Sequence, residues 1–307
     1  MPETKETMTT QSLSTVLCAG ETMALVTPRS VERLRSAEAF HLDVGGAESN
    51  VAAHLAALGR PARWFSRLGD DELGRRVADQ VSARGVILDD VVFDPLRATG
   101  VYFKDPGHGV LYYRAGSAAS ALCGKDAEDI RLEGVGLVHL SGITPALSPT
   151  AVEFVDVLMT RSARAGLPVS FDVNHRPLLW QEGAAPGVLK SFAERADILL
   201  VGLDEAERLW NTSTAQDVRD VFPHVPVLVV KDGAIGASEF TAQGYFFQPA
   251  IPTDVVEIVG AGDAFAAGYL DRYLAGAAPA DRLRAGHQRA SLTLQTTKDF
   301  TSEGATP

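Results

Sequence analysis

Short apolar runs alternate along the chain with longer amphipathic or Ala-rich segments. The apolar runs, each of strand length, occupy residues 16–26, 62–68, 136–140, 168–173, 197–201 and 227–231. Segments typical of helices lie between them and include residues 50–58, 71–83, 150–165 and 204–210. This alternation predicts a mostly parallel central sheet with helices on both faces, a three-layer α/β/α sandwich. Nearly continuous apolar strands fit such a sheet, because both of its faces are buried.

One stretch breaks the alternation and reads as strand, turn and strand without a helix. Residues 99–104 and 110–114 flank Asp105-Pro106-Gly107-His108-Gly109, whose composition is typical of a hairpin turn. A second polar–apolar alternation, over residues 39–44, could pair with this hairpin. We therefore expect a small β-sheet lid, contributed by about residues 37–46 and 91–117, projecting from the α/β body.

The 307 residues contain no internal repeat and no low-complexity linker. We expect a single domain over residues 15–307, including the lid, since a chain of this length can bury one large core. Residues 1–14 are rich in Thr, Ser and Glu and lack the apolar segment of a signal peptide. They are predicted to form a disordered tail.

Composition limits the partners of this chain. The net charge is -11, which disfavours nucleic acid, because phosphate binding needs a basic surface. The apolar runs are too short to cross a bilayer, so we expect no membrane partner and a cytoplasmic location. Cys18 and Cys123 lie far apart in sequence and form no C-x-x-C motif, so neither a disulfide framework nor a zinc site is predicted.

The sharpest chemical motif is Gly260-Ala261-Gly262-Asp263, which precedes the apolar run over residues 264–270. Glycines let the backbone approach a ligand, and a helix that starts here points its N–H groups at an anion beside a carboxylate. Phosphoryl transfer needs donors for the transferred group and a base for the acceptor hydroxyl. The alternative is that Asp263 only caps a helix after a tight turn.

Two further glycine-rich segments fit a ligand site. Gly45-Gly46-Ala47-Glu48-Ser49-Asn50 opens a helix, and residues 229–237 form a strand that runs into a Gly-rich turn able to border a nucleotide. Each also fits a structural alternative, an N-cap loop for the first and a hairpin for the second. P-loop, zinc-protease and nucleophile-elbow motifs are absent from the sequence, and no G-x-G-x-x-G follows a strand.

Together these motifs resemble the ribokinase-type carbohydrate kinases, also called the phosphofructokinase-B family. The similarity extends from about residue 17 to 299 and includes the segment at 45–50, Gly69-Asp70-Asp71-Glu72-Leu73-Gly74 and the segment at 260–263, in their usual order. The resemblance implies a ribokinase-like fold with a β lid, ATP and Mg²⁺ as cofactors, and Asp263 as the catalytic base. It also implies that residues 260–263 form an anion hole for the transferred group, with catalytic roles for Gly260, Ala261 and Gly262.

Within the family, three segments look like the branch that phosphorylates 2-keto-3-deoxygluconate. They are residues 112–121, residues 139–147 and Asp172-Val173-Asn174-His175-Arg176. A keto acid carries a carboxylate, which arginine binds bidentately. The similarity implies a sugar pocket that is lined by Gly46, Asn50, Tyr102, Tyr112, Arg114, Arg176 and Asp263. It implies ATP contacts from Asn174, Lys231, Gly233, Gly236, Gly260 and Gly262.

Two departures from the family pattern bear on the binding of cations. Gly202 stands where many relatives have Asn before Glu205, so Glu205 is predicted to contact the metal only indirectly. Residues 257–259 lack the hydroxyls that relatives carry there, which puts monovalent-cation activation in doubt.

Several alternatives stay open at this point. They are the galactonate epimer, a neutral sugar such as fructose or ribose, and a non-catalytic sugar or nucleotide sensor. Exposed lid strands need covering, so we expect a homo-oligomer formed through the lid.

Overall fold

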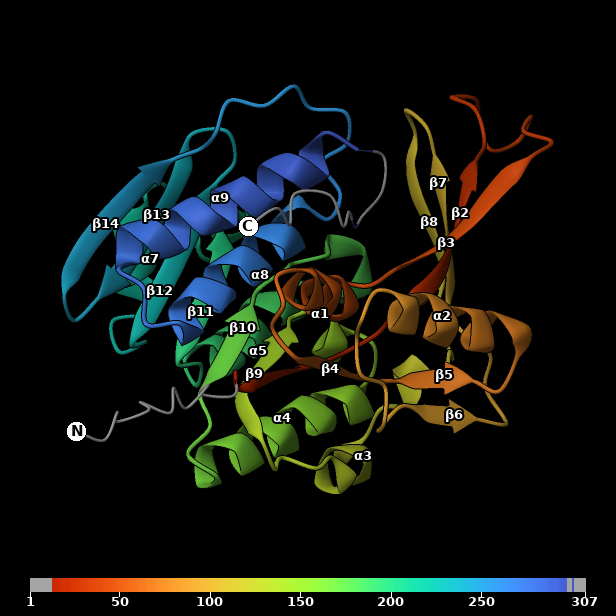
Figure 1. Cartoon of the computed structure of the whole chain (residues 1–307), viewed down its shortest axis with the longest axis horizontal. Helices are drawn as coiled ribbons and strands as arrows, with labels where there is room; N and C mark the ends of the chain where they lie inside the picture. The colour runs from red at the N-terminus through yellow and green to blue at the C-terminus, as the bar shows by residue number, and fades with distance from the viewer. Residues whose placement is uncertain (1–12, 297–299, 301–307) are drawn as a thin grey trace, which may run out of the picture.

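The computed structural model describes residues 13–296 and residue 300. Two layers of helices enclose a central sheet, and a second, smaller sheet projects from one side of the body (Figure 1). The tail predicted over residues 1–14 lies, up to residue 12, outside the described residues.

The central sheet has eight strands in the order β14-β13-β12-β11-β10-β9-β1-β4. Their bounds are β1 (Thr15–Ala19), β4 (Ala62–Phe65), β9 (Val135–Ser141), β10 (Val169–Asp172), β11 (Ile198–Gly202), β12 (Val227–Asp232), β13 (Gly236–Thr241) and β14 (Gly244–Pro249). Neighbours pair in parallel from β4 to β12, whereas β13 and β14 are antiparallel. The parallel strands end at one common edge, so the loops that follow β10, β11 and β12 meet there.

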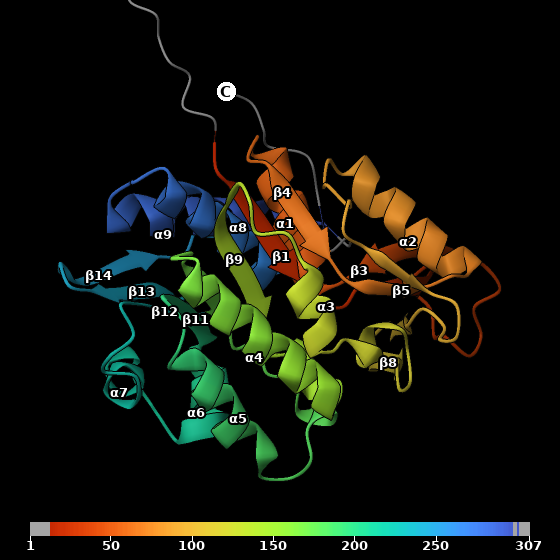
Figure 2. The ribbon, with the colours of Figure 1, turned by 90° about the horizontal axis from the view of Figure 1, so that it is seen from below.

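Helices cover both faces of this sheet (Figure 2). One apolar cluster joins the sheet to α3 (Gly124–Asp129), α4 (Pro149–Arg164), α5 (Ala184–Ala193), α6 (Leu203–Trp210) and α7 (Ala215–Val221). A second cluster joins it to α1 (Ala47–Ala57), α2 (Glu72–Ala83), α8 (Ala261–Leu274) and α9 (Pro279–Leu294). In the part of the chain that the structure describes, none of the helices has the length and apolar character of a membrane span.

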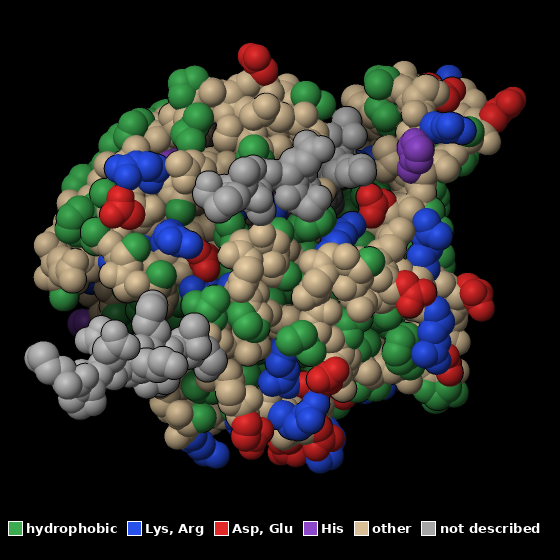
Figure 3. Space-filling model, viewed as in Figure 1, with side chains coloured by type: hydrophobic (Ala, Val, Ile, Leu, Met, Phe, Trp, Pro, Cys, Tyr) green, Lys and Arg blue, Asp and Glu red, His purple; other side chains and the backbone are tan. Residues whose placement is uncertain are grey.

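The projecting sheet, which we call the lid, has four strands in the order β3-β2-β7-β8. They are β2 (Met23–Pro28), β3 (Phe40–Gly45), β7 (Val101–Asp105) and β8 (Gly109–Tyr113). The predicted hairpin is present as β7 and β8, which pair in antiparallel register. In the space-filling view the lid stands out from the body as a separate lobe (Figure 3).

Two strands predicted from continuous apolar runs are wrong as single elements. Residues 16–26 divide into β1 of the central sheet and β2 of the lid. Residues 62–68 divide into β4 and β5 (Arg67–Gly69), and β5 pairs with β6 (Val92–Asp94) in a separate two-stranded sheet. Residues 92–94 therefore lie outside the lid. An apolar run records burial but not the sheet in which each half is buried, so the pattern could not reveal these breaks.

Candidate active site

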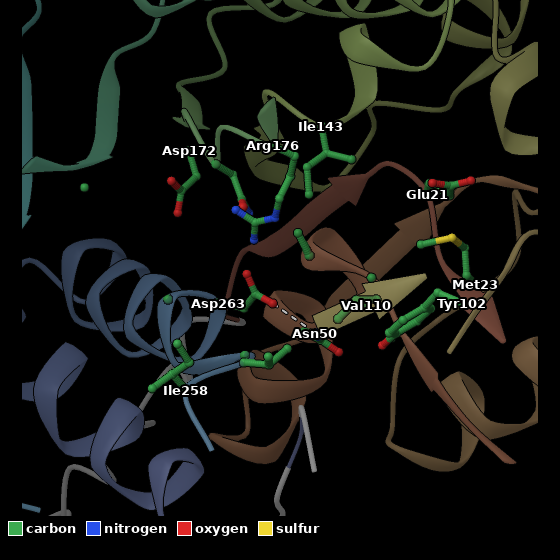
Figure 4. Close-up of a pocket in the computed structure, with 18 of the residues that line it drawn as sticks. Glu21, Met23, Asn50, Tyr102, Val110, Ile143, Asp172, Arg176, Ile258 and Asp263 are labelled. Atoms are coloured by element: carbon green, nitrogen blue, oxygen red, sulfur yellow. Dashed lines mark hydrogen bonds between the residues drawn. The ribbon is translucent and has the colours of Figure 1, made fainter. Parts of the chain in front are cut away.

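A cavity of about 570 Å³ lies between the carboxyl edge of the central sheet and the lid. It gathers residues predicted from segments more than two hundred positions apart in sequence, as Figure 4 shows for Asn50 and Asp263. The predicted residues that line it are Gly46, Asn50, Tyr102, Tyr112, Arg114, Asn174, Arg176, Glu205, Lys231, Gly233, Gly260, Gly262 and Asp263.

Asp263 lies in the first turn of α8 and is oriented by a residue of α1. Asn50 Nδ2 donates to Asp263 Oδ2 at 2.9 Å (Figure 4). Asn50 is only 2% exposed, and its Oδ1 is buried without a hydrogen-bond partner in the described part of the chain. A buried polar atom without a partner is costly, and this one lines the cavity, so it suits a ligand donor such as a sugar hydroxyl.

The start of α8 has the backbone geometry of an anion site. Gly260 is the N-cap and has φ 84°, a left-handed conformation that favours glycine. The Gly262 N–H makes no backbone hydrogen bond with any residue that the structure describes. Ala261 is not among the residues that line the cavity, and its N–H donates to Ile258 O at 3.3 Å, so its predicted role in the anion hole stays a prediction.

Lys231, at the carboxyl end of β12, supplies a positive charge beside this helix start. Its Nζ donates to Asp172 Oδ2 at 2.7 Å and to Oδ1 at 3.0 Å. A Cβ placed on Gly262 would lie 3.8 Å from the same Nζ, so the ammonium faces the N-terminus of α8. Burial lowers the pKa of Lys231, but Asp172 and Glu205 outweigh that effect and raise it above the ordinary value, so the amine is charged.

Glu205 stabilises the loop that follows β10 through hydrogen bonds. Its Oε1 accepts the His175 N–H at 2.8 Å and its Oε2 accepts the Gly202 N–H at 2.8 Å. The preceding residue, Asn174, has φ 41° and lines the cavity. Glu205 therefore holds the backbone between Asn174 and Arg176, which are predicted for ATP and for the sugar respectively.

The acidic side chains do not fit a protein-held magnesium site. Both Glu205 oxygens accept backbone N–H groups, and the Asp172 carboxylate is occupied by Lys231. Within residues 13–296 and 300, no group of three or more His, Cys, Asp or Glu side chains could hold a metal ion. The indirect role predicted for Glu205 stays a prediction.

The two arginines predicted for the substrate differ in environment. Arg114 is 9% exposed and forms an ion pair with Glu21. Arg176 is exposed, and its side chain extends into the cavity from the side opposite Asp263 (Figure 4). Tyr102 and Tyr112 stack on the inner side of the lid, with ring centroids 5.8 Å apart.

Gly236 is not among the residues that line the cavity, and its predicted ATP contact stays a prediction. It pairs with Pro249 in the antiparallel end of the sheet. A Cβ at this position would lie 2.4 Å from Gln248 O and 2.8 Å from the Phe247 ring. Strand packing therefore accounts for the glycine without any nucleotide.

Sequence reasoning missed several residues that line the cavity, namely Glu21, Met23, Lys104, Ile143 and Asp172. Asp172 carried a usable signal, because it is a carboxylate at the carboxyl end of a predicted parallel strand. Glu21 carried none, since the break between β1 and β2 that exposes it to the cavity was hidden within one apolar run.

Glu48, in the first turn of α1, is hydrogen-bonded to two residues at and just after the end of β9. It is fully buried, and its Oε1 accepts from Ser141 Oγ at 2.7 Å and Thr144 Oγ1 at 3.0 Å. Its Oε2 has no hydrogen-bond partner within residues 13–296 and 300. Burial raises the pKa of Glu48 to about 7, although the Ser141 hydrogen bond lowers it.

The Glu48→Gln variant is expected to become more stable relative to the wild type as pH rises. In the unfolded chain the carboxyl ionises near 4.5, but the folded pKa is about 7, so folding stability from Glu48 is full below 4.5 and lost as pH rises through 7. The difference in unfolding free energy between variant and wild type should shift by about 3 kcal/mol between pH 4 and pH 8. Denaturant unfolding at each pH measures it.

Two features keep this measurement specific to Glu48. Burial lowers the pKa of His139 to about 4, which gives an opposite pH dependence, but His139 is present in both proteins and cancels in the difference. The exposed Glu133→Gln serves as the matched control. A difference that does not change with pH would mean that Glu48 has the same pKa in the folded and the unfolded protein.

Comparison with known protein families matches residues 13–303 to the pfkB family carbohydrate kinases. The 2-dehydro-3-deoxygluconokinase of Bacillus subtilis (strain 168) is 32% identical over 292 residues, covering 92% of this chain and 90% of that protein. The 2-dehydro-3-deoxygalactonokinase of Haloferax volcanii is 31% identical over 285 residues, covering 89% and 88%. These two names describe the activities of the relatives.

Solved structures agree with the family match. The crystal structure of 2-dehydro-3-deoxygluconokinase from Thermotoga maritima has a TM-score of 0.86 at 26% identity, covering 94% of this chain and 95% of that chain. A PfkB protein from Polaromonas sp. JS666 has the same TM-score of 0.86 at 33% identity, covering 93% and 97%. The predicted three-layer ribokinase-like fold is thereby confirmed, and the chain belongs to the pfkB family of carbohydrate kinases.

Proposed function

We propose that the protein transfers the γ-phosphoryl group of ATP to a 2-keto-3-deoxy sugar acid, with 2-keto-3-deoxygluconate (2-dehydro-3-deoxygluconate) converted to its 6-phosphate. One observation carries this proposal. A single cavity holds an oriented carboxylate at a helix N-terminus, Asp263, and on its opposite side an arginine, Arg176. The first suits transfer to a hydroxyl and the second suits a substrate carboxylate.

In this proposal Asp263 receives the proton of the terminal sugar hydroxyl. Asn50 holds the carboxylate in place through the 2.9 Å hydrogen bond. A weak base suffices, because in a loose transition state the proton leaves late. The Gly262 N–H and the Lys231 ammonium face the position of the transferred group and would stabilise its charge.

The nucleotide is proposed to lie along the carboxyl edge of the sheet, against Asn174, Lys231, Gly233, Gly260 and Gly262. All five residues line the cavity. Mg²⁺ would arrive as part of the Mg-ATP substrate, because the protein side chains do not form a cage for it. The lid would close over the sugar through Tyr102 and Tyr112 and exclude water.

An assay of ADP release with Mg-ATP tests the proposal against 2-keto-3-deoxygluconate, its galactonate epimer, fructose and ribose. Turnover confined to the two keto acids is the expected result. The epimers share the carboxylate and the terminal hydroxyl, so the ratio of their kcat/KM values decides between them. Better turnover of a neutral sugar would contradict the role of Arg176, and no turnover with any of the four would favour a non-catalytic sensor.

The protein is further proposed to form a homo-oligomer through the lid. Strand β8 is an edge of the lid sheet, and its Leu111 and Tyr113 are 47% and 65% exposed. An open edge with apolar side chains favours pairing with a second copy. Light scattering should give a multiple of 32.6 kDa for the wild type, and Leu111→Lys/Tyr113→Lys should give a smaller mass. A monomeric wild type would contradict this proposal.

A further inference from the structure

A buried carboxylate, Glu21, lies on the lid side of the cavity in which the sugar acid is proposed to bind (Figure 4). It follows β1 and is 2% exposed. Its Oε2 accepts from Arg114 Nη2, and its Oε1 accepts from Ser117 Oγ at 3.2 Å. A carboxylate in this position is unexpected for an anionic substrate, because like charges repel.

The contacts of Arg114 explain the role of Glu21. The ion pair fixes one end of the guanidinium, and the Tyr112 ring lies 5.2 Å from its Cζ. The Arg114 Nε is buried and has no hydrogen-bond partner among the residues that the structure describes. Arg114 is thus held in one orientation with a donor left for a ligand, while Glu21 offsets its positive charge.

Arg176 has the opposite character. It is exposed, and it forms no ion pair with any residue in the described part of the chain. The Nη1 of Arg176 donates to His175 O at 3.2 Å, which orients the side chain without reducing its charge. Its positive charge is therefore available to an anion in the cavity.

We propose that the two arginines divide the recognition of the substrate. Arg176 pairs with the carboxylate, and Arg114, oriented by Glu21, donates a hydrogen bond to the neighbouring keto oxygen. Glu21 is then a positioning residue that makes the site select a keto acid over an acid with a hydroxyl at the same carbon. This inference rests on the proposed function, since it assumes a 2-keto acid as the substrate.

The separate roles of the two arginines are tested by titration calorimetry without ATP. It measures the Kd values of 2-keto-3-deoxygluconate and of its C2 alcohol, 3-deoxygluconate. The wild type should bind the keto acid more tightly, and Glu21→Gln should reduce the ratio of the two Kd values about tenfold, because a hydrogen bond to a charged group loses its alignment. Adding Arg114→Met to Glu21→Gln should lower the ratio no further than Arg114→Met alone. Arg176→Met should weaken the binding of both acids and leave the ratio of their Kd values unchanged.

Controls separate positioning from folding. The exposed Glu133→Gln is the matched control and should leave the ratio unchanged. Ser117→Ala removes the second hydrogen bond to Glu21 without changing a charge, so it should lower the ratio by less than Glu21→Gln does. If Glu21→Gln fails to fold, the comparison of Ser117→Ala with the wild type decides.

The inference would be overturned if folded Glu21→Gln had the same ratio of Kd values as the wild type. If Glu21→Gln does not fold, an unchanged ratio in Ser117→Ala would overturn it. Lys104 is another positively charged lid residue that lines the cavity. The inference would also be overturned if Lys104→Met lost binding of the acids while Arg176→Met kept it. Failure of the proposed function looks different. If the wild type binds the two acids with the expected ratio of Kd values but releases no ADP, the kinase proposal is contradicted and the separate roles of Arg114 and Arg176 stand. If the wild type binds neither acid, both proposals are contradicted.

Discussion

Replacing Asp263 by asparagine is expected to lower kcat by a factor of about 10²–10⁴, the usual contribution of a positioned general base. The amide keeps the size of the side chain and can still accept the hydrogen bond from Asn50, which is 2.9 Å long in the wild type. It cannot take the hydroxyl proton. The KM for the sugar acid should change much less, because the substrate contacts remain. Steady-state ADP release gives both parameters.

The same chemical change at an exposed position provides the control for this experiment. Asp281→Asn, on the surface of α9, should leave kcat unchanged. If Asp263→Asn retained wild-type turnover, Asp263 would be a helix cap and the base would lie elsewhere. A rise in KM with unchanged kcat would instead assign Asp263 to substrate binding alone.

Replacing Lys231 by methionine is expected to lower kcat about 10²–10³-fold, as for the loss of one group that stabilises charge in the transition state. The ammonium faces the start of α8, 3.8 Å from the position of a Cβ on Gly262. Burial, Asp172 and Glu205 together leave the pKa of Lys231 raised, so the group carries its charge at every pH used in an assay.

This variant alone would confuse catalysis with stability. Asp172 is a buried carboxylate, with a side chain 4% exposed, and Lys231 is its ion-pair partner. Breaking a buried pair costs about 3–5 kcal/mol, and the 20% exposure of the Lys231 side chain places this pair at the low end of that range. Lys231→Met should therefore also unfold at a lower temperature.

The double variant Lys231→Met/Asp172→Asn separates the two effects. Removing both charges should recover most of the lost stability, since no uncompensated carboxylate is left, but it should not recover kcat. Thermal unfolding and ADP release on the same samples make the comparison. Recovery of kcat together with stability would show that Lys231 serves only to neutralise Asp172.

The layered architecture and the site motifs near the ends of the chain could be predicted from the order of residue types. Alternating apolar runs and helical segments predicted the parallel sheet, and the turn at residues 105–109 predicted the hairpin of the lid. Gly260 and Asp263 were recognisable because a helix start that binds an anion needs local backbone freedom and a nearby carboxylate. Such features are properties of a few consecutive residues, so they can be read from the sequence alone.

Which side chains neutralise one another could not be predicted in this way and became visible in the folded protein. Glu21 and Arg114 are separated by 93 positions, and Lys231 and Asp172 by 59, yet each pair is in contact. The structure also showed that Gly236 accommodates Phe247 and that Ala261 donates to its own turn. Charge balance in a cavity depends on which strand ends and lid loops meet, and that follows from the packing of distant segments. No local pattern of residue types records it.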